Sequence, residues 1–399
     1  MPNTLKTLTD GDITREALRI LKNSNSILKS VNRQYDDRFA KEGAKNGGTL
    51  QIRLPNRYTV GTGRSITPQD TTELTTALTV GTQKHVPVQF FSDELTLSLD
   101  DFSDRILKPA MSVLGSNIAA SVGTAMASAF VNQVGTSGTT PSSFLTFAQA
   151  GEMLDWQTAP RDGNRSAIVN PTVMAAIADA QKGLFHSADQ IEGGFEDGMI
   201  DMMTGFKFKM DQSLPTITNG ARSGYTTHGT TVHTSGTATI AVITGTNPMA
   251  AGETFTLAGI YEVNPDTKVS TGRLKVFTIA TLYAGGAGNI TVSENIYTSG
   301  PYQNVSAALP TTTTLTFSGS ASTAYTRNFC FHRDSTVLAT ADLEMPKGVD
   351  MAYRATMDGL SLRFIRDYDV TTDNFMGRFD ILYGIKVVRP NWGVHVLGA

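Results

Sequence analysis

The longest regular hydrophobic pattern of the chain lies between residues 97 and 134. Its apolar side chains recur every three or four positions, the spacing of one face of an α-helix, so we predict a spine helix. The packing face of this helix is expected to include Met111, Leu114, Ile118 and Val122. Asp100, Asp101 and Asp104 supply the negative charge that favours a helix start, and Pro109 permits a bend or restart. Charge is absent from residues 111–134, which also suggests a transmembrane span, but frequent Ser, Thr, Asn and Gln residues argue against it.

Alternating apolar and polar residues predict two strands before the spine helix, TLQIRLP (49–55) and HVPVQFF (85–91). A polar stretch rich in threonine separates them. A long two-stranded excursion of this kind is marginal in water by itself, so we expect something outside the chain to cover it. Residues 1–45 form a polar arm with a short helix over 13–23, capped by Asp12, that has to dock on the body or on a neighbouring chain.

After the spine helix the sequence pattern predicts both helices and strands, and farther along the chain it predicts strands alone. Short helices are predicted over 143–156 and 171–180, with a buried strand over 166–169. Residues 219–328 are rich in Thr, Gly and Ser and contain five or six short strand patterns between turns, which favours a small antiparallel β-barrel. From residue 329 the pattern again predicts both helices and strands, so we expect the barrel to be inserted into another domain. The chain ends in extended strands that we expect beside the spine helix.

Composition limits the functional class. A chain of 399 residues is too long for one ordinary core, so two or three domains are expected. A net charge of −3 excludes a generally basic nucleic-acid binder. Cys330 is the only cysteine, which excludes an internal disulfide framework. The N-terminal sequence lacks the apolar core of a signal peptide, so we expect a soluble protein made in a cytoplasm.

Few residues indicate catalysis. His332, Arg333 and Asp334 match the first letters of a kinase catalytic loop, but Ala339 stands where that loop needs asparagine. Cys330 and His332 are only two potential metal ligands, and a buried thiol beside a hydrogen-bonded imidazole explains them better than a metal site. A triad assembled in space stays open. We predict no catalytic residue, no metal site and no cofactor.

Six sequence runs, taken in order, carry a resemblance to a known family. They are SDELTLSLDDFSDRILKPA (92–110), IVNPTVMAA (168–176), DGMIDMMTGFKFKMDQSLP (197–215), GETFTLAGIYEVNPDTKVSTGRLKVF (252–277), NFCFHRDSTVLAT (328–340) and RFDILYGIKVVRPNWGVHVLG (378–398). The chain resembles the major capsid (coat) proteins of tailed double-stranded DNA bacteriophages, in particular the short-tailed (podovirus) branch with an inserted I-domain.

The resemblance implies an α+β fold, that of tailed-phage and herpesvirus major capsid proteins, with a small antiparallel β-barrel inserted. The implied parts are an N-terminal arm (1–45), an E-loop (46–95), a peripheral domain with the spine helix (96–144 and 346–399), an axial domain (145–218 and 329–345) and the inserted barrel (219–328).

The resemblance also implies the function and the partners. Copies of the chain are expected to form hexamers and pentamers of an icosahedral shell that expands as DNA is packaged. Expected partners are a separate scaffolding protein, a portal protein at one vertex and packaged double-stranded DNA contacted non-specifically, with no membrane. The expected location is the virion capsid, assembled in the host cytoplasm.

Charged residues are the candidates for contacts between subunits. They are Arg53, Arg57, Arg64 and Lys84 in the E-loop, and Asp266, Lys268 and Arg273 in the barrel. Each also suits an ordinary solvated face. Lys84 and Asn391 have the residue types of the covalent crosslink found in some phage shells, but neither sits in a matching motif.

Two other functions compete with the capsid hypothesis. A tail or decoration protein would also be Thr/Gly-rich β-structure, but the spine helix and the inserted position of the barrel argue against it. An enzyme with a carbohydrate-binding β-module would use tryptophan platforms, yet Trp156 and Trp392 both fall outside the predicted barrel.

Overall fold

The computed structural model of the chain describes residues 10–23, 25–35, 49–64, 68–69, 73–91, 106–181, 202–228, 233–370 and 374–398. The fold divides into two compact units, which are described separately below. The first holds residues 1–52, 75–122 and 336–386, and the second holds 53–74, 123–335 and 387–399. The predicted helix-start residues Asp100, Asp101 and Asp104 lie outside the described residues, as do parts of the predicted arm (1–9 and 36–45) and of the predicted E-loop.

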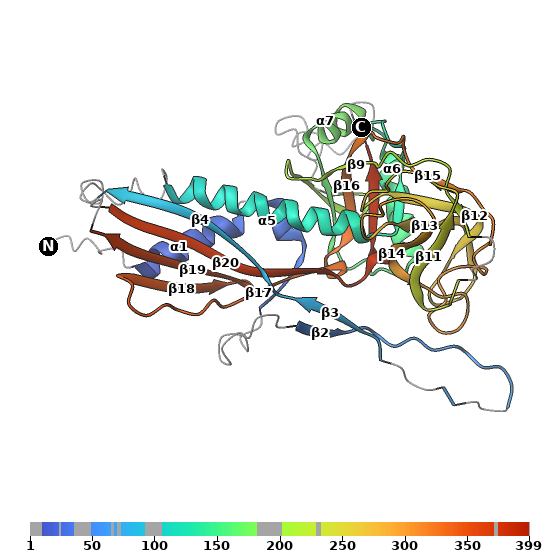
Figure 1. The fold of residues 1–399 in the computed structure, drawn as a ribbon, viewed down its shortest axis with the longest axis horizontal. Coiled ribbons are helices and arrows are strands. Elements are labelled where there is room, and N and C mark those ends of the chain that lie inside the picture. Colours follow the sequence, from blue (N-terminus) through green and yellow to red (C-terminus); the bar gives the residue numbers. More distant parts are fainter. Residues whose placement is uncertain are drawn as a thin grey trace. The chain divides into compact units, whose positions relative to one another are not determined.

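A six-stranded sheet forms the framework of the first unit (Figure 1). Its strand order is β1-β17-β20-β19-β18, and β4 also pairs with β20. The strands are β1 (Asn32–Tyr35), β4 (Thr82–Phe91), β17 (Thr336–Ala341), β18 (Met351–Met357), β19 (Leu360–Asp369) and β20 (Asn374–Val387). β1 runs parallel to β17, whereas β4, β20, β19 and β18 pair antiparallel. The sheet therefore joins strands from both ends of the chain.

Two short helices precede this sheet in the chain. α1 (Asp10–Asn23) packs on β18 and β19 through a stripe that includes Ala17, Leu18 and Leu21. α2 (Ser26–Ser30) is capped by Asn25, whose side chain accepts a hydrogen bond from the Ile27 backbone. α1 starts at Asp10, so the prediction that Asp12 caps a helix beginning at residue 13 is wrong. The arm is docked because its apolar stripe finds a sheet to cover.

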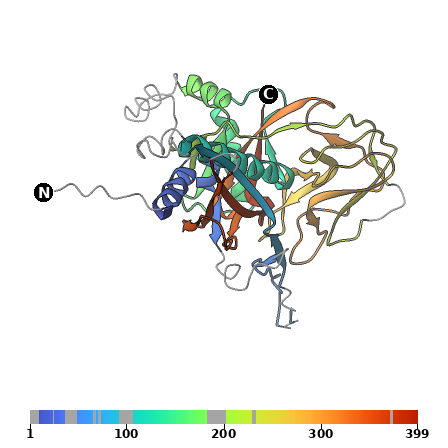
Figure 2. The ribbon, with the colours of Figure 1, turned by 60° about the vertical axis from the view of Figure 1, so that its left-hand side comes forward.

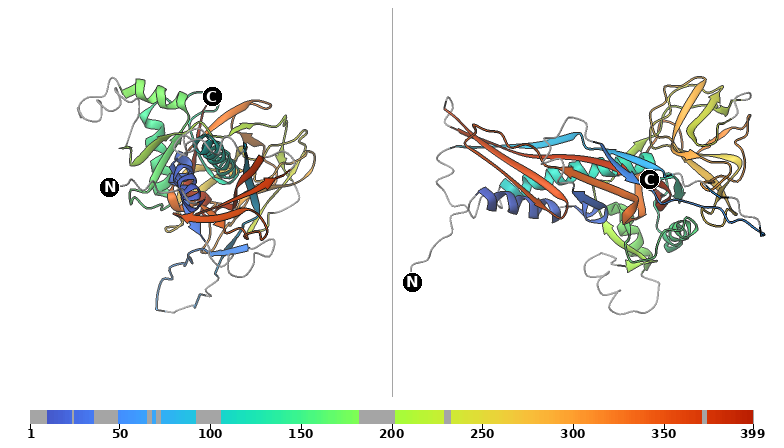
Figure 3. Two further views of the ribbon diagram at one scale, coloured as in Figure 1. Left: turned by 90° about the vertical axis from the view of Figure 1, so that its left-hand side faces the viewer. Right: turned by 90° about the horizontal axis from the view of Figure 1, so that it is seen from below.

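The predicted spine is helix α5 (Lys108–Ala129), with Pro109 in its first turn (Figure 3). Met111, Leu114, Ile118 and Val122 are all buried. In the described part of the chain, α5 is the one helix long and apolar enough to cross a membrane, but half of its apolar window is buried inside the protein. The core helix of a soluble protein can have the same length and composition, so these two properties alone are weak evidence for a membrane span.

The predicted excursion before the spine helix has a different strand pairing from the one expected. β2 (Thr49–Arg53) pairs with β3 (Thr75–Thr79), a strand that we did not predict. The expected second strand, β4, pairs instead with β20 over ten residues, from Thr82 opposite Tyr383 to Phe91 opposite Asn374. β20 is long enough for β4 to form a ladder with it that is twice the length of β2. The longer ladder holds more backbone hydrogen bonds, which explains why β4 pairs with β20.

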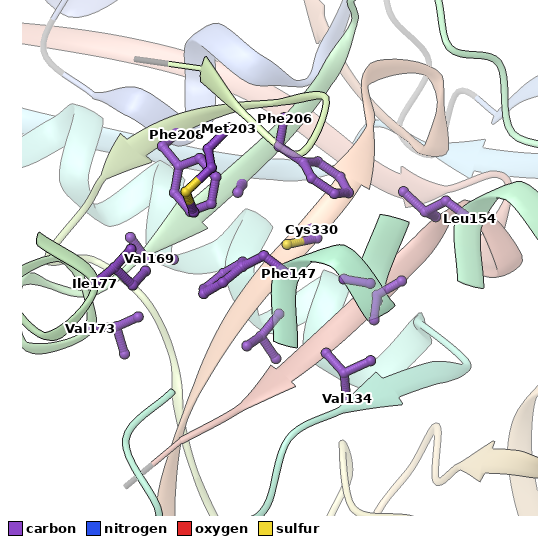
Figure 4. Close-up of a cluster of buried hydrophobic side chains, with 14 of the residues drawn as sticks. Val134, Phe147, Leu154, Val169, Val173, Ile177, Met203, Phe206, Phe208 and Cys330 are labelled. Carbon is purple, nitrogen blue, oxygen red and sulfur yellow. The ribbon is translucent and has the colours of Figure 1, made fainter. Parts of the chain in front are cut away.

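A seven-stranded sheet and two helices form one part of the second unit. The strand order is β5-β21-β16-β6-β8-β7, and β9 also pairs with β16. The strands are β5 (Asn132–Val134), β6 (Arg165–Val169), β7 (Met202–Met203), β8 (Phe206–Met210), β9 (Thr216–Thr218), β16 (Ala324–His332) and β21 (Gly393–Leu397); the helices are α6 (Phe144–Trp156) and α7 (Pro171–Gln181). Short 3₁₀ turns span Arg333–Ser335 and Pro390–Trp392. Side chains of both helices and this sheet meet in one apolar core that includes Phe147, Phe206 and Cys330 (Figure 4).

Residues 219–323 of the second unit, drawn from yellow-green to orange in Figure 2, contain two three-stranded antiparallel sheets. One has the order β10-β11-β14 and the other β13-β12-β15. The strands are β10 (Thr226–Thr227), β11 (Thr237–Ile243), β12 (Thr254–Val263), β13 (Ser270–Thr278), β14 (Gly288–Ile296) and β15 (Leu315–Phe317). Single bridges link the sheet edges, Ile279 to Val292 and Thr226 to Thr314. The two sheets enclose a common core around Phe255 and Phe277, whose rings stack at 5.5 Å.

Two strands lie in a different sheet from the one expected. We assigned residues 346–399 to the domain of the spine helix, but β21 pairs with β16 and β5 in the seven-stranded sheet. All five residues of β21 are buried, and a strand covered on both faces belongs inside a sheet. Conversely β17, which we assigned with residues 329–345 to the axial domain, pairs with β1 in the six-stranded sheet.

Candidate assembly surfaces

The β2–β3 strand pair is exposed for most of its length. Residues of both strands alternate between exposed and half-buried, apart from the buried Leu78 of β3. Arg53 reaches Glu73 across the end of the pair, with Nη1 and Oε2 3.4 Å apart, and both side chains are largely in solvent. The backbone N–H of Leu54 donates to the carbonyl of Leu74 at 2.8 Å. An exposed ion pair contributes little, so the strand pair has weak internal support.

Beyond the strand pair the chain forms a loop with unusually exposed apolar side chains. Val60 is 97% exposed and Tyr58 57%. The Gln69 side-chain amide accepts a hydrogen bond from the Thr59 N–H at 2.9 Å and donates one to the Thr59 carbonyl at 2.5 Å. It therefore bonds the backbone of Thr59 as a neighbouring β-strand would. Arg64 is exposed in the same loop. This loop presents apolar surface and backbone to solvent, a combination that favours pairing with another chain.

The other charged candidates lie in three places. Lys84 of β4 is half-buried and sits opposite Ile381. Arg57 is half-buried, and its positive charge helps to lower the pKa of Arg389, after the larger effect of burial. Burial is also the main reason why the pKa of Lys268 is lowered, and the charge of Arg57 adds to it. Within the second unit the positive charge of Arg57 therefore acts on both Lys268 and Arg389.

The three candidates of the β12–β13 hairpin already have partners within the chain. The Lys268 ammonium donates to the carbonyl of Pro301. The guanidinium of Arg273 pairs with Glu152 of α6 at 2.6 Å. Asp266 is exposed, and its backbone N–H donates to the Asn264 side chain at 2.9 Å. Arg273 thus links the hairpin to α6, while Asp266 keeps its carboxylate in solvent.

Sequence reasoning missed two buried charge clusters. In one, Gln157, the C-cap residue of α6, donates to Glu262 at 2.5 Å, and Lys275 pairs with Glu294 beside it at 2.5 Å. Burial raises the pKa of Glu262 above its ordinary value. The other cluster contains Arg222, Glu253 and Arg327. No periodicity or motif in the Thr/Gly-rich sequence signals these groups, because their partners are brought together only by strand pairing.

The residues that suggested catalysis are structural. Cys330 is fully buried, and burial raises the pKa of its thiol, which keeps it protonated and unreactive. The His332 ring contacts Asp162 through Nε2 at 3.0 Å and packs edge-on against Trp392 at 5.2 Å. Within the described ranges no group of three or more His, Cys, Asp or Glu side chains is placed to hold a metal ion.

The exposed strand pair and the charges that pair within the chain are typical of structural proteins that assemble. A family model described as P22 coat protein, gene protein 5, matches residues 57–398. The chain belongs to the P22 coat protein family. It is a major capsid protein of a bacteriophage, a structural component of the icosahedral shell of the virion and not an enzyme.

Solved phage structures show distant likenesses. A chain of Mycobacterium phage Che8 is 12% identical, with 93% of this chain and 90% of that chain covered and a TM-score of 0.45. The capsid of cyanophage P-SCSP1u is 10% identical, with 94% and 89% covered and a TM-score of 0.44. The mature capsid of bacteriophage PhiM1 is 10% identical, with 92% and 86% covered and a TM-score of 0.44. No curated protein sequence matches the chain. The assignment rests on the family model.

Proposed function

We propose that copies of this chain form the hexamers and pentamers of the shell, and that loop 54–74 with strands β2 and β3 is the E-loop that each subunit lays on a neighbour. The observation that carries the proposal is the exposure of Val60 and Tyr58 in the loop beyond a strand pair that has little support of its own. Burying an apolar side chain of this size contributes roughly 1.5–3 kcal/mol, so a neighbour gains from covering this loop.

We further propose the capsid architecture of the short-tailed branch, with boundaries adjusted to the strand pairing. The arm is 1–45 and the E-loop 46–81, because β4 belongs with β20. The peripheral domain combines the spine helix with β4 and residues 336–386, and the axial domain takes the seven-stranded sheet, including β21.

Residues 219–323, five residues shorter than the expected 219–328 because β16 begins at Ala324, are proposed to be the inserted domain, a small β-barrel. The bridges Ile279–Val292 and Thr226–Thr314 support this, because they connect the two three-stranded sheets into a cycle of six strands. Within this domain Asp266 is the best candidate for a contact between subunits, because its carboxylate is exposed. Arg273 is assigned an internal role because it pairs with Glu152.

The remaining parts of the proposal concern partners. A separate scaffolding protein directs assembly in the host cytoplasm, a portal occupies one vertex, and packaged DNA is contacted non-specifically. The net charge of −3 supports a wall that encloses DNA without binding it tightly. Arg53, Arg57 and Arg64 are the proposed contacts of the E-loop, and Lys84 of β4 is a further proposed contact between subunits.

The test is to express the chain with and without a candidate scaffolding protein, and to examine it by negative-stain electron microscopy and sedimentation. Closed shells, or rings far larger than a 42.7 kDa monomer, are expected. Val60→Asp is expected to stay folded by circular dichroism and to fail to assemble. The matched control is Val113→Asp, an exposed valine on α5 that is 66% accessible, which should assemble. A wild-type monomer under every condition contradicts the proposal, and normal assembly of Val60→Asp contradicts the role of the loop.

A further inference from the structure

Three charged groups of the second unit are buried together where β16 meets the start of β12. They are Arg222, Glu253 and Arg327, and each is at most 7% exposed. Arg222 Nη1 lies 2.8 Å from Glu253 Oε2. Burial is the main reason why the pKa of Arg327 is lowered to about 10; Glu253 favours its charged form, Arg222 opposes it, and Tyr325 favours it weakly. Buried charges are normally paired and hydrogen-bonded, so each group can be checked for its partners.

Arg222 and Glu253 pair with each other, and Glu253 Oε2 is held by this ion pair alone. Glu253 Oε1 accepts hydrogen bonds from the backbone N–H groups of Gly220 and Ala250, both at 2.6 Å. The Arg222 guanidinium donates to the carbonyl of Gly319 at 3.0 Å and lies 4.3 Å above the Phe317 ring. The single carboxylate is therefore engaged by Arg222 and by two backbone donors.

Arg327 is the exception. Its side chain is fully buried, and none of Nε, Nη1 and Nη2 has a hydrogen-bond partner among the residues that the structure describes. Its backbone N–H is satisfied by the carbonyl of Pro215 at 3.0 Å, so only the guanidinium lacks a partner. A buried cation without hydrogen bonds costs several kcal/mol, which a folded protein normally offsets with a bound group.

The neighbouring strand supplies no negative charge. His395 of β21 is fully buried, and burial, helped by the charge of Arg327, lowers its pKa to about 3, so the ring is neutral. Its Nε2 contacts the carbonyl of Phe130 at 3.0 Å. Its Nδ1 has no hydrogen-bond partner in the described part of the chain. Two guanidinium groups thus share one carboxylate, and one positive charge remains in excess.

We propose that the Arg327 guanidinium holds a small inorganic anion of halide size, most readily chloride, buried between β16, β21 and the start of β12. A bound water molecule accepts hydrogen bonds from the guanidinium but leaves its excess positive charge. A monovalent anion accepts the hydrogen bonds and also neutralises that charge. Arg327 lies between the buried aromatic residues Tyr325 and Phe329 on its strand. An ion that enters must lose its water, which favours a weakly hydrated halide over sulfate or phosphate.

The test is thermal unfolding of the purified full chain, followed by tryptophan fluorescence, because Trp156 and Trp392 both belong to the second unit. Chloride replaces gluconate at constant ionic strength and scan rate. A ligand that binds only the folded state stabilises it in proportion to the logarithm of its concentration. We expect the midpoint to rise by about 2 to 4 °C per tenfold increase in chloride above its dissociation constant. Bromide should act similarly and sulfate should not.

Arg327→Met keeps the bulk of the side chain and removes its charge, so the chloride dependence should disappear. The matched control is Arg161→Met, which removes an exposed arginine and should keep the dependence. Equal midpoints of the wild type in chloride and gluconate, or an unchanged chloride effect in Arg327→Met, overturn the proposal.

A second measurement covers the case in which Arg327→Met does not fold. Wild-type crystals grown in bromide should show an anomalous difference peak within hydrogen-bond reach of the Arg327 guanidinium. Density at this position without a bromide signal identifies a water molecule and also overturns the proposal.

Discussion

Glu253 provides the sharpest test of how the second unit is held together. Its buried carboxylate joins the Arg222 guanidinium to the backbone of Gly220 and Ala250. It therefore fixes the start of segment 219–323 to the loop before β12. Glu253→Gln removes the charge but keeps an oxygen that can accept both backbone hydrogen bonds. Glu253→Ala removes the charge and the acceptor together.

The two variants should differ by a calculable amount. Breaking a buried ion pair by removal of one partner costs about 3–5 kcal/mol, which is the expected loss for Glu253→Gln. Glu253→Ala also leaves the Gly220 and Ala250 N–H groups without an acceptor, at about 1–3 kcal/mol each. We therefore expect an additional loss of about 2–6 kcal/mol, enough to unfold a unit of ordinary stability.

Urea unfolding followed by tryptophan fluorescence measures these losses, since both tryptophans lie in the same unit. The matched control is Asp266→Asn, an equivalent carboxylate-to-amide change at an exposed position, which should leave the midpoint unchanged. A loss below about 1 kcal/mol for Glu253→Gln, or identical midpoints for the two variants, would refute this account of the buried ion pair.

Three further variants test other parts of the structure. A Cβ at Gly393 meets the Phe130 ring at 2.2 Å, so Gly393→Ala should lower stability by about 1–3 kcal/mol in urea unfolding; an unchanged midpoint contradicts this packing. The pKa of His395 is about 3 in the folded state against 6.5 ordinarily, so only the unfolded chain gains a proton between these values. Stability should fall as the pH drops below 6.5, and less steeply in His395→Gln; parallel pH profiles argue against a buried neutral ring. Ile118→Ala should lower the free energy of unfolding, measured by circular dichroism, by about 2–5 kcal/mol. Val113→Ala, at an exposed position, should lower it by less than about 0.5 kcal/mol; equal losses argue against the assigned packing face.

Local pattern was enough to predict most individual elements. The run of apolar residues from Met111 to Val122 predicted α5, and Ser143 lies at the N-cap of α6, where the helix was expected to start. The strand predicted over 166–169 and the helix predicted over 171–180 coincide with β6 and α7. These features depend on side-chain period and capping within a few residues, which the sequence shows directly.

Strand partners were decided only by the tertiary structure. β4 was expected to pair with its neighbour in sequence and pairs with β20, and β21 lies in the sheet of β16. The choice depends on ladder length and on which strands can be buried on both faces, and neither is a local property.

The same holds for the buried charges. Arg222, Glu253 and Arg327 are far apart in sequence and stand among residues of no distinctive pattern. Their contact follows from strand pairing, which brings the start of segment 219–323, the loop before β12 and β16 to one place. The sequence determined that this chain has a long core helix with β-strands before and after it along the chain. The tertiary structure alone decided which charges are buried, because burial depends on segments that the chain brings together only when it folds.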